Sequence, residues 1–318
     1  MSKTGTDLTQ AAAYLKAGQL VAIPTETVYG LAANALDEQA VLSIYEAKQR
    51  PFFDPLIIHL SSIAHISKYA ELTDPRLIKL ADAFWPGPLT LLLPKTILVP
   101  DLVTSGLPQV AVRIPQHPLT LGLLKALDFP LAAPSANPFG YVSPTEPAHV
   151  EKQLGKKVSY ILDGGRSSVG IESTIVGTED DKVCVYRLGG LAIEDLEKVI
   201  GKVYLQINHS SDPKAPGQLK NHYAPMKPLY VGDINALIKK FSGKKITVLS
   251  FGDSAEVNAS VQLNLSEKGD TKEAALNLFR FLREADDNDT ELILAEKLPE
   301  SGLGTAINDR LLRASIRP

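Results

Sequence analysis

LVAIPTETVYG at residues 20–30 and KQRPFFDPLIIH at residues 48–59 are the stretches that decide the fold. Each contains a short apolar run that is typical of a buried strand. Gly30 permits a tight turn after the first run. A stretch with helical periodicity then covers 37–47, with Asp37 as its N-cap. The order of strand, helix and strand predicts a protein of the α/β class.

Polar side chains gather where these predicted elements end. In open α/β sheets, ligands bind at the edge where strands end, so we expect the polar side chains to share one site. Any one of them alone is explained by turn chemistry or by a solvated Lys/Arg pair, whereas the whole set favours a binding site. The set contains two cations, three hydroxyl groups and one imidazole: Lys48, Arg50, Thr25, Thr27, Tyr29 and His59.

Length and composition bound the class of protein. The chain has 318 residues, of which 44% are hydrophobic and 22% charged, which predicts a globular protein of one large or two ordinary domains. A net charge of −3 gives no global basic field, so any contact with a polyanion is expected to be local. The polar N-terminus lacks the apolar segment of a signal peptide, and no apolar run approaches the roughly 18 residues of a membrane span. We therefore expect a cytoplasmic protein without membrane contact.

Cysteine and histidine spacing argues against a metal site built from protein side chains. The single cysteine, Cys184, excludes an internal disulfide and a cysteine-based metal cluster. It lies in an apolar alternation at 183–186, where a buried structural thiol is expected. The six histidines show no His-Glu-x-x-His or Cys–His spacing, so a dedicated zinc site is not expected.

Two further polar clusters follow predicted strands. PSANP at 134–138 offers small side chains and backbone N–H groups that suit a phosphate or carboxylate, although no P-loop pattern is present. DGGR at 163–166 predicts a hairpin turn, and GIESTIV at 170–176 leads into a strand with Ser173 near its start. Ser135 lacks a Gly-x-Ser-x-Gly elbow, which disfavours a hydrolase triad.

The chain divides into three parts. Residues 1–203 combine strands and helices and form the predicted first domain. Residues 204–228 are proline-rich and too long for an ordinary connection, and His222 with Tyr223 near their end favours a functional linker or lid over a disordered tether. Residues 229–318 alternate strands and helices, which predicts a smaller three-layer, Rossmann-like domain with a parallel sheet.

Four cations at predicted element ends indicate the chemistry. Lys48, Arg50, Arg113 and Arg187 provide too much positive potential for a neutral ligand, and they suit a triphosphate together with a carboxylate. Mg²⁺ arriving with the nucleotide is the expected cofactor, because proteins bind it mainly through phosphates. The expected reaction is phosphoryl or nucleotidyl transfer, catalysed by positioning and charge stabilisation.

The sequence resembles the YrdC-type family, the threonylcarbamoyl-AMP synthases. The motifs are PTETVYGL at 24–31, KQRP at 48–51, PSAN at 134–137 and ESTI at 172–175. The linker, from APG at 215–217 to HYAP at 222–225, and the second domain resemble the long, two-domain form of the family. The resemblance covers essentially the whole chain and implies a YrdC-like twisted mixed sheet with helices in the first domain.

The resemblance also implies an activity and a set of site residues. L-Threonine, bicarbonate and ATP would give L-threonylcarbamoyladenylate and pyrophosphate. A downstream tRNA threonylcarbamoyl transferase would use this intermediate to modify tRNA, with a weak direct contact to tRNA as a further expectation. The implied catalytic residues are Lys48, Arg50, Ser135 and Asn137. The implied threonine-binding residues are Thr27, His59, Arg113 and Ser173. The implied nucleotide-binding residues are Arg50, Asp54, Gln109, Ala133, Ser135, Ser143, Arg187 and Tyr223, with Tyr223 folding back as a lid.

Three residues depart from the family pattern. Asp54 replaces a frequent asparagine, Gln109 a frequent threonine, and Phe139 a small polar residue. The Asp54 carboxylate would either repel phosphate or face Mg²⁺.

One alternative function is a non-catalytic RNA-binding module, which the net charge disfavours. Another is a carbamoyl transferase acting on carbamoyl phosphate, but this chain lacks the zinc-finger cysteines of the related hydrogenase maturation proteins.

Overall fold

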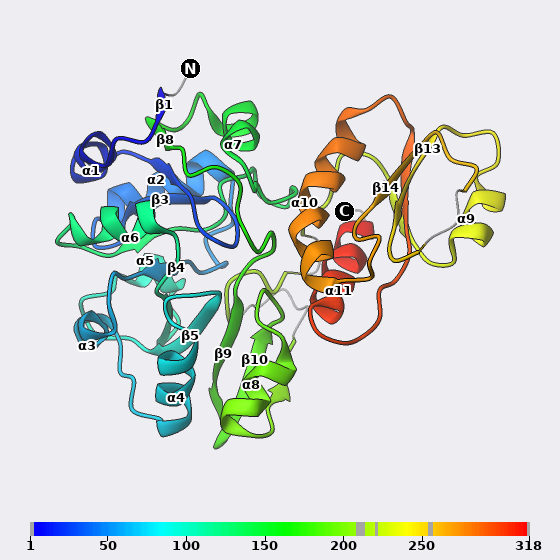
Figure 1. The fold of residues 1–318 in the computed structure, drawn as a ribbon. Helices are drawn as coiled ribbons and strands as arrows, with labels where there is room; N and C mark the ends of the chain where they lie inside the picture. Colours follow the sequence, from blue (N-terminus) through cyan, green and yellow to red (C-terminus); the bar gives the residue numbers. More distant parts are fainter. Residues whose placement is uncertain (1–2, 208–213, 220–221, 254–256, 317–318) are drawn as a thin grey trace.

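The computed structural model describes residues 3–207, 214–219, 222–253 and 257–316. These residues form an eleven-stranded sheet in the first domain and a four-stranded sheet in the second. Figure 1 shows the two domains side by side, with α10 (Thr271–Asp287) and α11 (Gly304–Ser315) between the two sheets.

The large sheet is mixed, as predicted for the first domain. Its order is β1-β8-β2-β3-β7-β4-β6-β5-β9-β10-β11. β2 pairs antiparallel with β3 and parallel with β8, and β4 pairs parallel with β6. The strands are β1 (Lys3–Gly5), β2 (Val21–Ile23), β3 (Gly30–Asn34), β4 (Ile57–His59), β5 (Leu89–Pro94), β6 (Gln109–Arg113), β7 (Leu131–Ala132), β8 (Tyr160–Leu162), β9 (Thr174–Glu179), β10 (Lys182–Arg187) and β11 (Tyr204–Leu205).

Short acidic side chains start the first two helices of this domain. Asp7 accepts hydrogen bonds from the backbone N–H groups of the first turn of α1, and Asp37 caps α2 in the same way. None of the helices in the described ranges is long and apolar enough to cross a bilayer. The helices are α1 (Leu8–Lys16), α2 (Glu38–Lys48), α3 (Ile66–Tyr69), α4 (Pro75–Phe84), α5 (Asp101–Thr104), α6 (Pro118–Lys125), α7 (Pro147–Leu154) and α8 (Ile193–Ile200), with a 3₁₀ turn at η1 (Ile63–His65).

β2 illustrates why an unbroken apolar run forms a strand here. Val21 and Ile23 belong to the buried cluster that contains Leu15 of α1. Ala22, between them, belongs to the cluster on the other face of the sheet, which contains Ile44 of α2. Because successive side chains point to opposite faces and both faces are covered, every position of this strand is buried.

The second domain is built as its alternating pattern predicts. Its four strands pair in parallel, in the order β12-β15-β13-β14. α9 lies on the side away from the first domain (Figure 1), and α10 and α11 lie on the side toward it. Besides α10 and α11, the elements are β12 (Leu229–Val231), α9 (Ile234–Lys240), β13 (Ile246–Ser250), β14 (Val261–Asn264) and β15 (Leu292–Ala295).

An apolar core runs from one domain into the other. Val142 of the first domain, Tyr223 of the linker and Phe279 of α10 belong to one buried cluster. The rings of Tyr223 and Phe279 stack with their centroids 5.5 Å apart. β11 pairs with β10, so the first sheet ends at Leu205, just beyond the expected domain boundary. Cys184 is buried, as expected.

Two turn predictions are wrong. Gly30 begins β3, a strand that the sequence pattern did not indicate, and it pairs there with Ile23. Glycine suits this position because a Cβ here would lie 3.2 Å from the Cβ of Ala133, which is a tight contact. The segment 163–166 is not a hairpin turn, because β8 pairs with β1 and β2 whereas the next strand, β9, pairs with β5 and β10.

The shared core predicts that Phe279→Ala destabilises the protein strongly. Phe279 is fully buried, so truncation leaves a cavity beside Tyr223 and should lower the free energy of unfolding by about 3–5 kcal/mol. Denaturant unfolding measures this loss. The control is Ile97→Ala, because Ile97 is 97% exposed and its truncation should change stability by less than about 0.5 kcal/mol. Equal stabilities of the two variants would contradict a core that joins the domains.

Candidate active site

A cavity lies where three strands of the large sheet end. His59 ends β4, Arg113 ends β6 and Arg187 ends β10. The free space is about 50 Å³, far below the roughly 300–1,000 Å³ of small-molecule pockets, and linker residues form part of its wall. The lining residues are Thr25, Thr27, Val28, Gly30, Arg50, Pro55, Ile57, His59, Arg113, Ala133, Pro134, Ser135, Glu172, Ser173, Arg187, Pro216, Gly217, His222 and Tyr223.

Three acceptors hold Arg113 in the cavity wall. Its Nε donates to the Gly87 carbonyl (3.2 Å) and its Nη1 donates to Thr27 Oγ1 (2.8 Å). Its Nη2 donates to Glu26 Oε1 (2.6 Å), and both side chains of this ion pair are buried. The guanidinium plane is thereby fixed. One N–H on each terminal nitrogen has no partner among the described residues and is available to an oxyanion.

The Thr25 hydroxyl determines how Thr27 is oriented. Thr25 Oγ1 donates to the Val28 carbonyl (2.6 Å) and lies 2.8 Å from Thr27 Oγ1. Because the hydrogen of Thr25 is used by Val28, Thr27 donates to Thr25 and accepts from Arg113. The PTET motif therefore forms one connected set of hydrogen bonds that leads to Arg113.

His59 is a neutral imidazole in this site. Burial, and then the nearby charge of Arg113, lowers the pKa of His59 to about 3. Its Nδ1 is buried and has no hydrogen-bond partner in the described part of the chain. A buried polar atom of this kind calls for a partner, and a substrate group in the cavity is one candidate.

Arg50 is fixed by the loop that follows it. Its Nε donates to the Asp54 carbonyl (3.0 Å), and its Nη2 donates to the Pro55 carbonyl (2.7 Å) and pairs with Asp54 Oδ2 (2.9 Å). Burial raises the pKa of the Asp54 carboxyl, and the charge of Arg50 opposes this rise. Gly217 N of the linker donates to Asp54 Oδ1 over 3.4 Å. Asp54 thus pairs with Arg50 and contacts the linker behind the cavity wall.

Lys48 supports the loop that carries Ser135. Its Nζ donates to the carbonyl oxygens of Ser135 and Asn137, both at 2.5 Å. Burial, and then the charge of Arg50, lowers the pKa of Lys48 well below its usual range. Asn137 Nδ2 donates to the Tyr141 carbonyl and so holds the next part of the loop. Of Lys48, Ser135 and Asn137, Ser135 alone lines the cavity.

Arg187 joins the ESTI motif to the linker. Its Nε donates to the Ser173 carbonyl (3.0 Å), its Nη2 to Ser173 Oγ (2.9 Å) and its Nη1 to the Pro216 carbonyl (3.3 Å). Ser173 Oγ also lies 2.7 Å from Thr90 Oγ1. Burial lowers the pKa of Arg187 to about 10, so the group is still cationic near neutral pH.

Helix α11 of the second domain holds the linker against the cavity. Arg313 Nη2 donates to the carbonyl oxygens of Gly217 (2.8 Å) and Leu219 (2.6 Å). The guanidinium carbons of Arg310 and Arg313 lie 5.3 Å and 4.8 Å from the centroid of the Tyr223 ring. These cation–π contacts and hydrogen bonds fix the linker conformation that closes the cavity.

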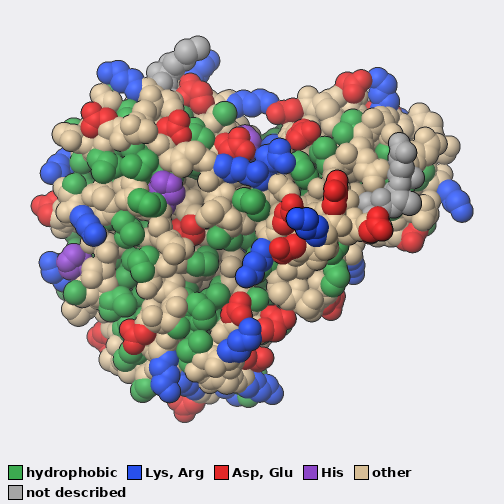
Figure 2. All heavy atoms as spheres, viewed as in Figure 1, with side chains coloured by type: hydrophobic (Ala, Val, Ile, Leu, Met, Phe, Trp, Pro, Cys, Tyr) green, Lys and Arg blue, Asp and Glu red, His purple; other side chains and the backbone are tan. Residues whose placement is uncertain are grey.

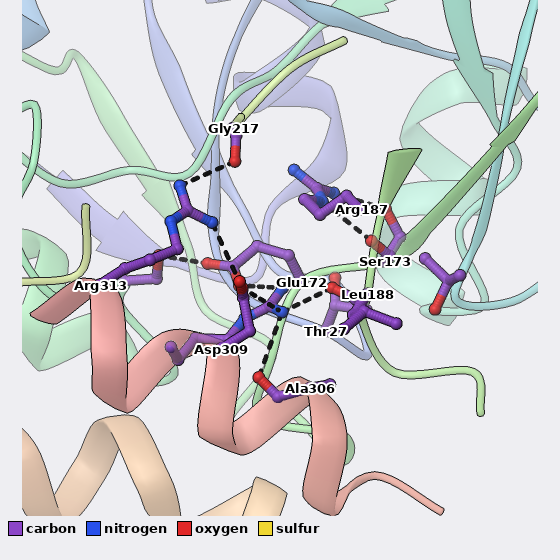
Figure 3. A network of polar contacts seen from close by, with 12 residues as sticks. Thr27, Glu172, Ser173, Arg187, Leu188, Gly217, Ala306, Asp309 and Arg313 are labelled. Carbon is purple, nitrogen blue, oxygen red and sulfur yellow. Dashed lines mark hydrogen bonds and ion pairs between the residues drawn. The ribbon is translucent and has the colours of Figure 1, made fainter. Parts of the chain in front are cut away.

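Glu172 connects the same helix to the first domain. Its Oε1 accepts from Ser143 Oγ (2.5 Å), and its Oε2 accepts from Arg310 Nη2 (3.2 Å) and Nε (3.3 Å). Figure 3 shows Glu172 between α11 and the two strand ends at which Ser173 and Arg187 lie. A lining residue of the first domain is therefore positioned by a side chain of the second.

The structure brings most of the predicted residues to the cavity. All four predicted threonine-binding residues line it: Thr27, His59, Arg113 and Ser173. Of the predicted catalytic and nucleotide-binding residues, Arg50, Ala133, Ser135, Arg187 and Tyr223 line it. The other predicted residues, Lys48, Asp54, Gln109, Asn137 and Ser143, are not lining residues.

The structure explains why some of the predicted residues do not line the cavity. Gln109 begins the five-residue strand β6 that Arg113 ends, which separates their Cα atoms by about 13 Å. The Tyr29 hydroxyl, expected at the same edge as the threonines, donates instead to the Gly165 carbonyl (2.7 Å). Sequence reasoning also gave no role to Glu26 or Glu172, although both lie inside recognised motifs.

The positive charge of the site is internal. Arg50, Arg113 and Arg187 are all buried. On the face shown in Figure 2, basic and acidic side chains are interspersed. This face therefore shows no extended basic stripe of the kind that an RNA-binding module uses.

The lowered pKa of His59 predicts a pH dependence of stability. The unfolded chain binds a proton near pH 6.5 and the folded chain only near pH 3, so the free energy of unfolding falls as pH drops through this window. His59→Gln removes this contribution. The loss of stability between about pH 7 and 5.5 should shrink by about 1 kcal/mol, measured by denaturant unfolding. His65→Gln, at an exposed histidine, is the control, and an unchanged loss in His59→Gln would contradict the prediction.

The contacts of Arg313 predict that Arg313→Met loosens the linker. Methionine keeps much of the apolar stem but cannot donate to the carbonyl oxygens of Gly217 and Leu219. Amide hydrogen exchange at residues 214–219 should become faster, while exchange in β2 is unchanged. Leu312→Ala, at a partly exposed neighbour, is the matched control. Unchanged exchange in Arg313→Met would show that other contacts hold the linker.

Comparison with known proteins identifies the family. A family model for Sua5, YciO and YrdC, described as telomere recombination, matches residues 13–189. A model described as threonylcarbamoyl-AMP synthase, C-terminal domain, matches residues 191–315.

Similar proteins align over nearly the whole chain. The threonylcarbamoyl-AMP synthase of Pyrococcus abyssi is 44% identical over 321 residues, which cover 96% of this chain and 93% of that protein. The threonylcarbamoyl-AMP synthase of Bacillus subtilis is 40% identical over 330 residues, which cover 99% and 94%. The crystal structure of P. abyssi Sua5 complexed with L-threonine has a TM-score of 0.92 and 40% identity, covering 99% of this chain and 97% of that one. The resemblance seen in the sequence is thus confirmed, and the chain belongs to the Sua5/YciO/YrdC family in its two-domain form.

Proposed function

We propose that this protein synthesises L-threonylcarbamoyladenylate from L-threonine, bicarbonate and ATP, with release of pyrophosphate. The observation that carries the proposal is the convergence of Arg50, Arg113, Ser135, Ser173 and Arg187 on one cavity. These residues come from distant parts of a chain whose similar proteins are threonylcarbamoyl-AMP synthases. The product is the intermediate for threonylcarbamoyladenosine in tRNA.

The end of the cavity around Arg113 suits the amino acid. The two free N–H groups of Arg113 match the two oxygens of an α-carboxylate. The neutral imidazole of His59 and the hydroxyl of Ser173 offer hydrogen-bond partners for the amino and hydroxyl groups of threonine. In this proposal the threonine nitrogen attacks the carbon of bicarbonate, a C–N bond forms and one water molecule leaves, which gives the carbamate.

The end around Arg187 suits the nucleotide. Arg187 is a lining cation that has no carboxylate partner among the described residues, and Ser135 faces the same cavity. The carbamate oxygen formed on threonine attacks the α-phosphorus of ATP, and pyrophosphate leaves. Fixed cations at this end stabilise the negative charge that develops on the leaving group. Lys48 contributes by holding the carbonyl groups of the Ser135 loop in place.

Mg²⁺ is the cofactor that fits this proposal, bound through the phosphates of ATP. The described residues contain no group of three His, Cys, Asp or Glu side chains arranged to hold a metal. The lining carboxylate, Glu172, accepts hydrogen bonds from Ser143 and Arg310. Such a donor set fits an ion that keeps water and phosphate as its main ligands. When bound, Mg²⁺ supplies further charge stabilisation for the leaving pyrophosphate.

The linker acts as a lid in this proposal. A cavity with free space of about 50 Å³ is too small for ATP, so in this proposal the linker residues that line it, at 216–217 and 222–223, move outward when the nucleotide enters. Their return excludes water, which protects the carbamate from decomposition. Release of the product then requires a second opening, from which a downstream tRNA threonylcarbamoyl transferase receives it. The proposed location of this reaction is the cytoplasm, and a weak direct contact with tRNA is part of the proposal.

A product assay tests the proposed function. Purified protein with ATP, Mg²⁺, bicarbonate and L-threonine should release pyrophosphate and form threonylcarbamoyl-AMP, detected by mass spectrometry. Omission of threonine or bicarbonate should abolish both signals, because each supplies atoms of the product. Equal pyrophosphate release without threonine would contradict the function. Salt-dependent binding of tRNA in a protein without turnover would favour the RNA-binding alternative.

Variants at the cavity test the placement of the site. Arg50→Ala should lower turnover by about 10²-fold or more, because a guanidinium group that lines the cavity is lost and the buried Asp54 carboxylate loses its partner. The far-UV circular dichroism spectrum should not change. Lys95→Ala, at an ion pair with the exposed Asp101, is the control and should keep full turnover. Wild-type turnover in Arg50→Ala would remove Arg50 from the site.

A further inference from the structure

A buried carboxylate lies directly behind the arginine that is proposed to bind threonine. Glu26 Oε1 accepts from Arg113 Nη2 (2.6 Å), and Glu26 Oε2 accepts from Gln116 N (3.0 Å). Glu26 is 4% exposed and does not line the cavity. It therefore acts on the cavity through Arg113, whose charge it balances and whose orientation it fixes together with Thr27 and the Gly87 carbonyl.

The lining arginines differ in how their charges are balanced. Arg113 is paired with Glu26, and Arg50 is paired with Asp54. Arg187 has hydroxyl and carbonyl acceptors and no carboxylate partner within the described ranges. Glu172, which lines the same cavity, acts on the charge of Arg187 but is itself paired with Arg310. Of these three arginines, Arg187 is thus the one whose guanidinium no carboxylate of the described residues contacts directly.

We propose that Glu26 is the residue that keeps phosphate groups out of the threonine end of the cavity. It positions the Arg113 fork for an α-carboxylate and cancels its charge. A monoanionic carboxylate still gains two hydrogen bonds from the fork, whereas a multiply charged phosphate meets the nearby carboxylate charge. This inference rests on the proposed function and assigns each substrate of that reaction to its own end of the cavity.

An amide cannot replace the Glu26 carboxylate in this role. Both carboxylate oxygens accept a hydrogen bond, one from Arg113 and one from Gln116 N. A glutamine side chain has one acceptor oxygen, so its NH₂ group would face one of the two donors, Arg113 or Gln116 N, and could not accept from it. Glu26→Gln therefore leaves Arg113 with an unbalanced charge and a less fixed plane. Glu26→Asp keeps the charge but shortens the reach by one methylene group.

Inhibition by inorganic phosphate, measured on the full-length chain, tests the proposal. In the wild type, phosphate should compete with ATP and not with threonine. In Glu26→Gln, phosphate should also compete with threonine, and KM for threonine should rise about tenfold with kcat changed less than about threefold. Glu26→Asp should raise KM for threonine as well but should not acquire competition between phosphate and threonine. A purely structural role of Glu26 predicts the same loss in both variants and no change in the inhibition pattern.

The outcomes separate this inference from the proposed function. Asp101→Asn, which breaks an exposed pair with Lys95, is the control and should behave like the wild type. If Glu26→Gln shows wild-type inhibition while the wild type makes product from threonine, the proposed function stands and this inference is wrong. If Glu26→Gln does not fold, the KM values of Glu26→Asp for threonine and for ATP test the inference. A rise in KM for threonine with an unchanged KM for ATP supports the inference, and equal rises in both overturn it.

Discussion

A guanidinium group that is taken out of water must find protein partners for its charge and for its N–H groups, or the folded state loses stability. The cavity of this protein is shaped by that requirement. Arg113 pairs with Glu26 and donates to Thr27, whereas Arg50 pairs with Asp54 in the loop that follows it. Arg187 donates to Ser173 and to a carbonyl group of the linker. The acceptors of Arg113 and Arg187 come from other segments of the chain, so satisfying these two arginines also fixes the position of one motif relative to another. Arg50 is satisfied within the loop that follows it.

Local rules of sequence predicted much of the fold. The apolar run of β2, the aspartate cap of α2, and the alternating pattern of the second domain all follow from periodicity and capping. Gly30 shows where such rules end. Glycine is a common turn residue, and the reason for it here, the approach of the Ala133 side chain, exists only once distant strands have paired.

The site was predicted less completely, because motif residues carry no information about which way a side chain turns after folding. Lys48 lies next to Arg50 in one motif, yet its ammonium group is used by two backbone carbonyl groups. Arg310 and Arg313 belong to no motif recognised in the sequence. They lie on a helix that begins almost a hundred residues after the first domain ends, and their partners are Glu172 and backbone carbonyl groups of the linker. No local pattern indicates such pairings.

The core that passes through Val142, Tyr223 and Phe279 constrains how such a chain can change over generations. A substitution on α10 alters the support beneath the Tyr223 ring, and Tyr223 is itself part of the cavity wall. Neither half is then free to drift alone. A chimaera assembled from distant members of the family would therefore need a matched seam along α10 and α11.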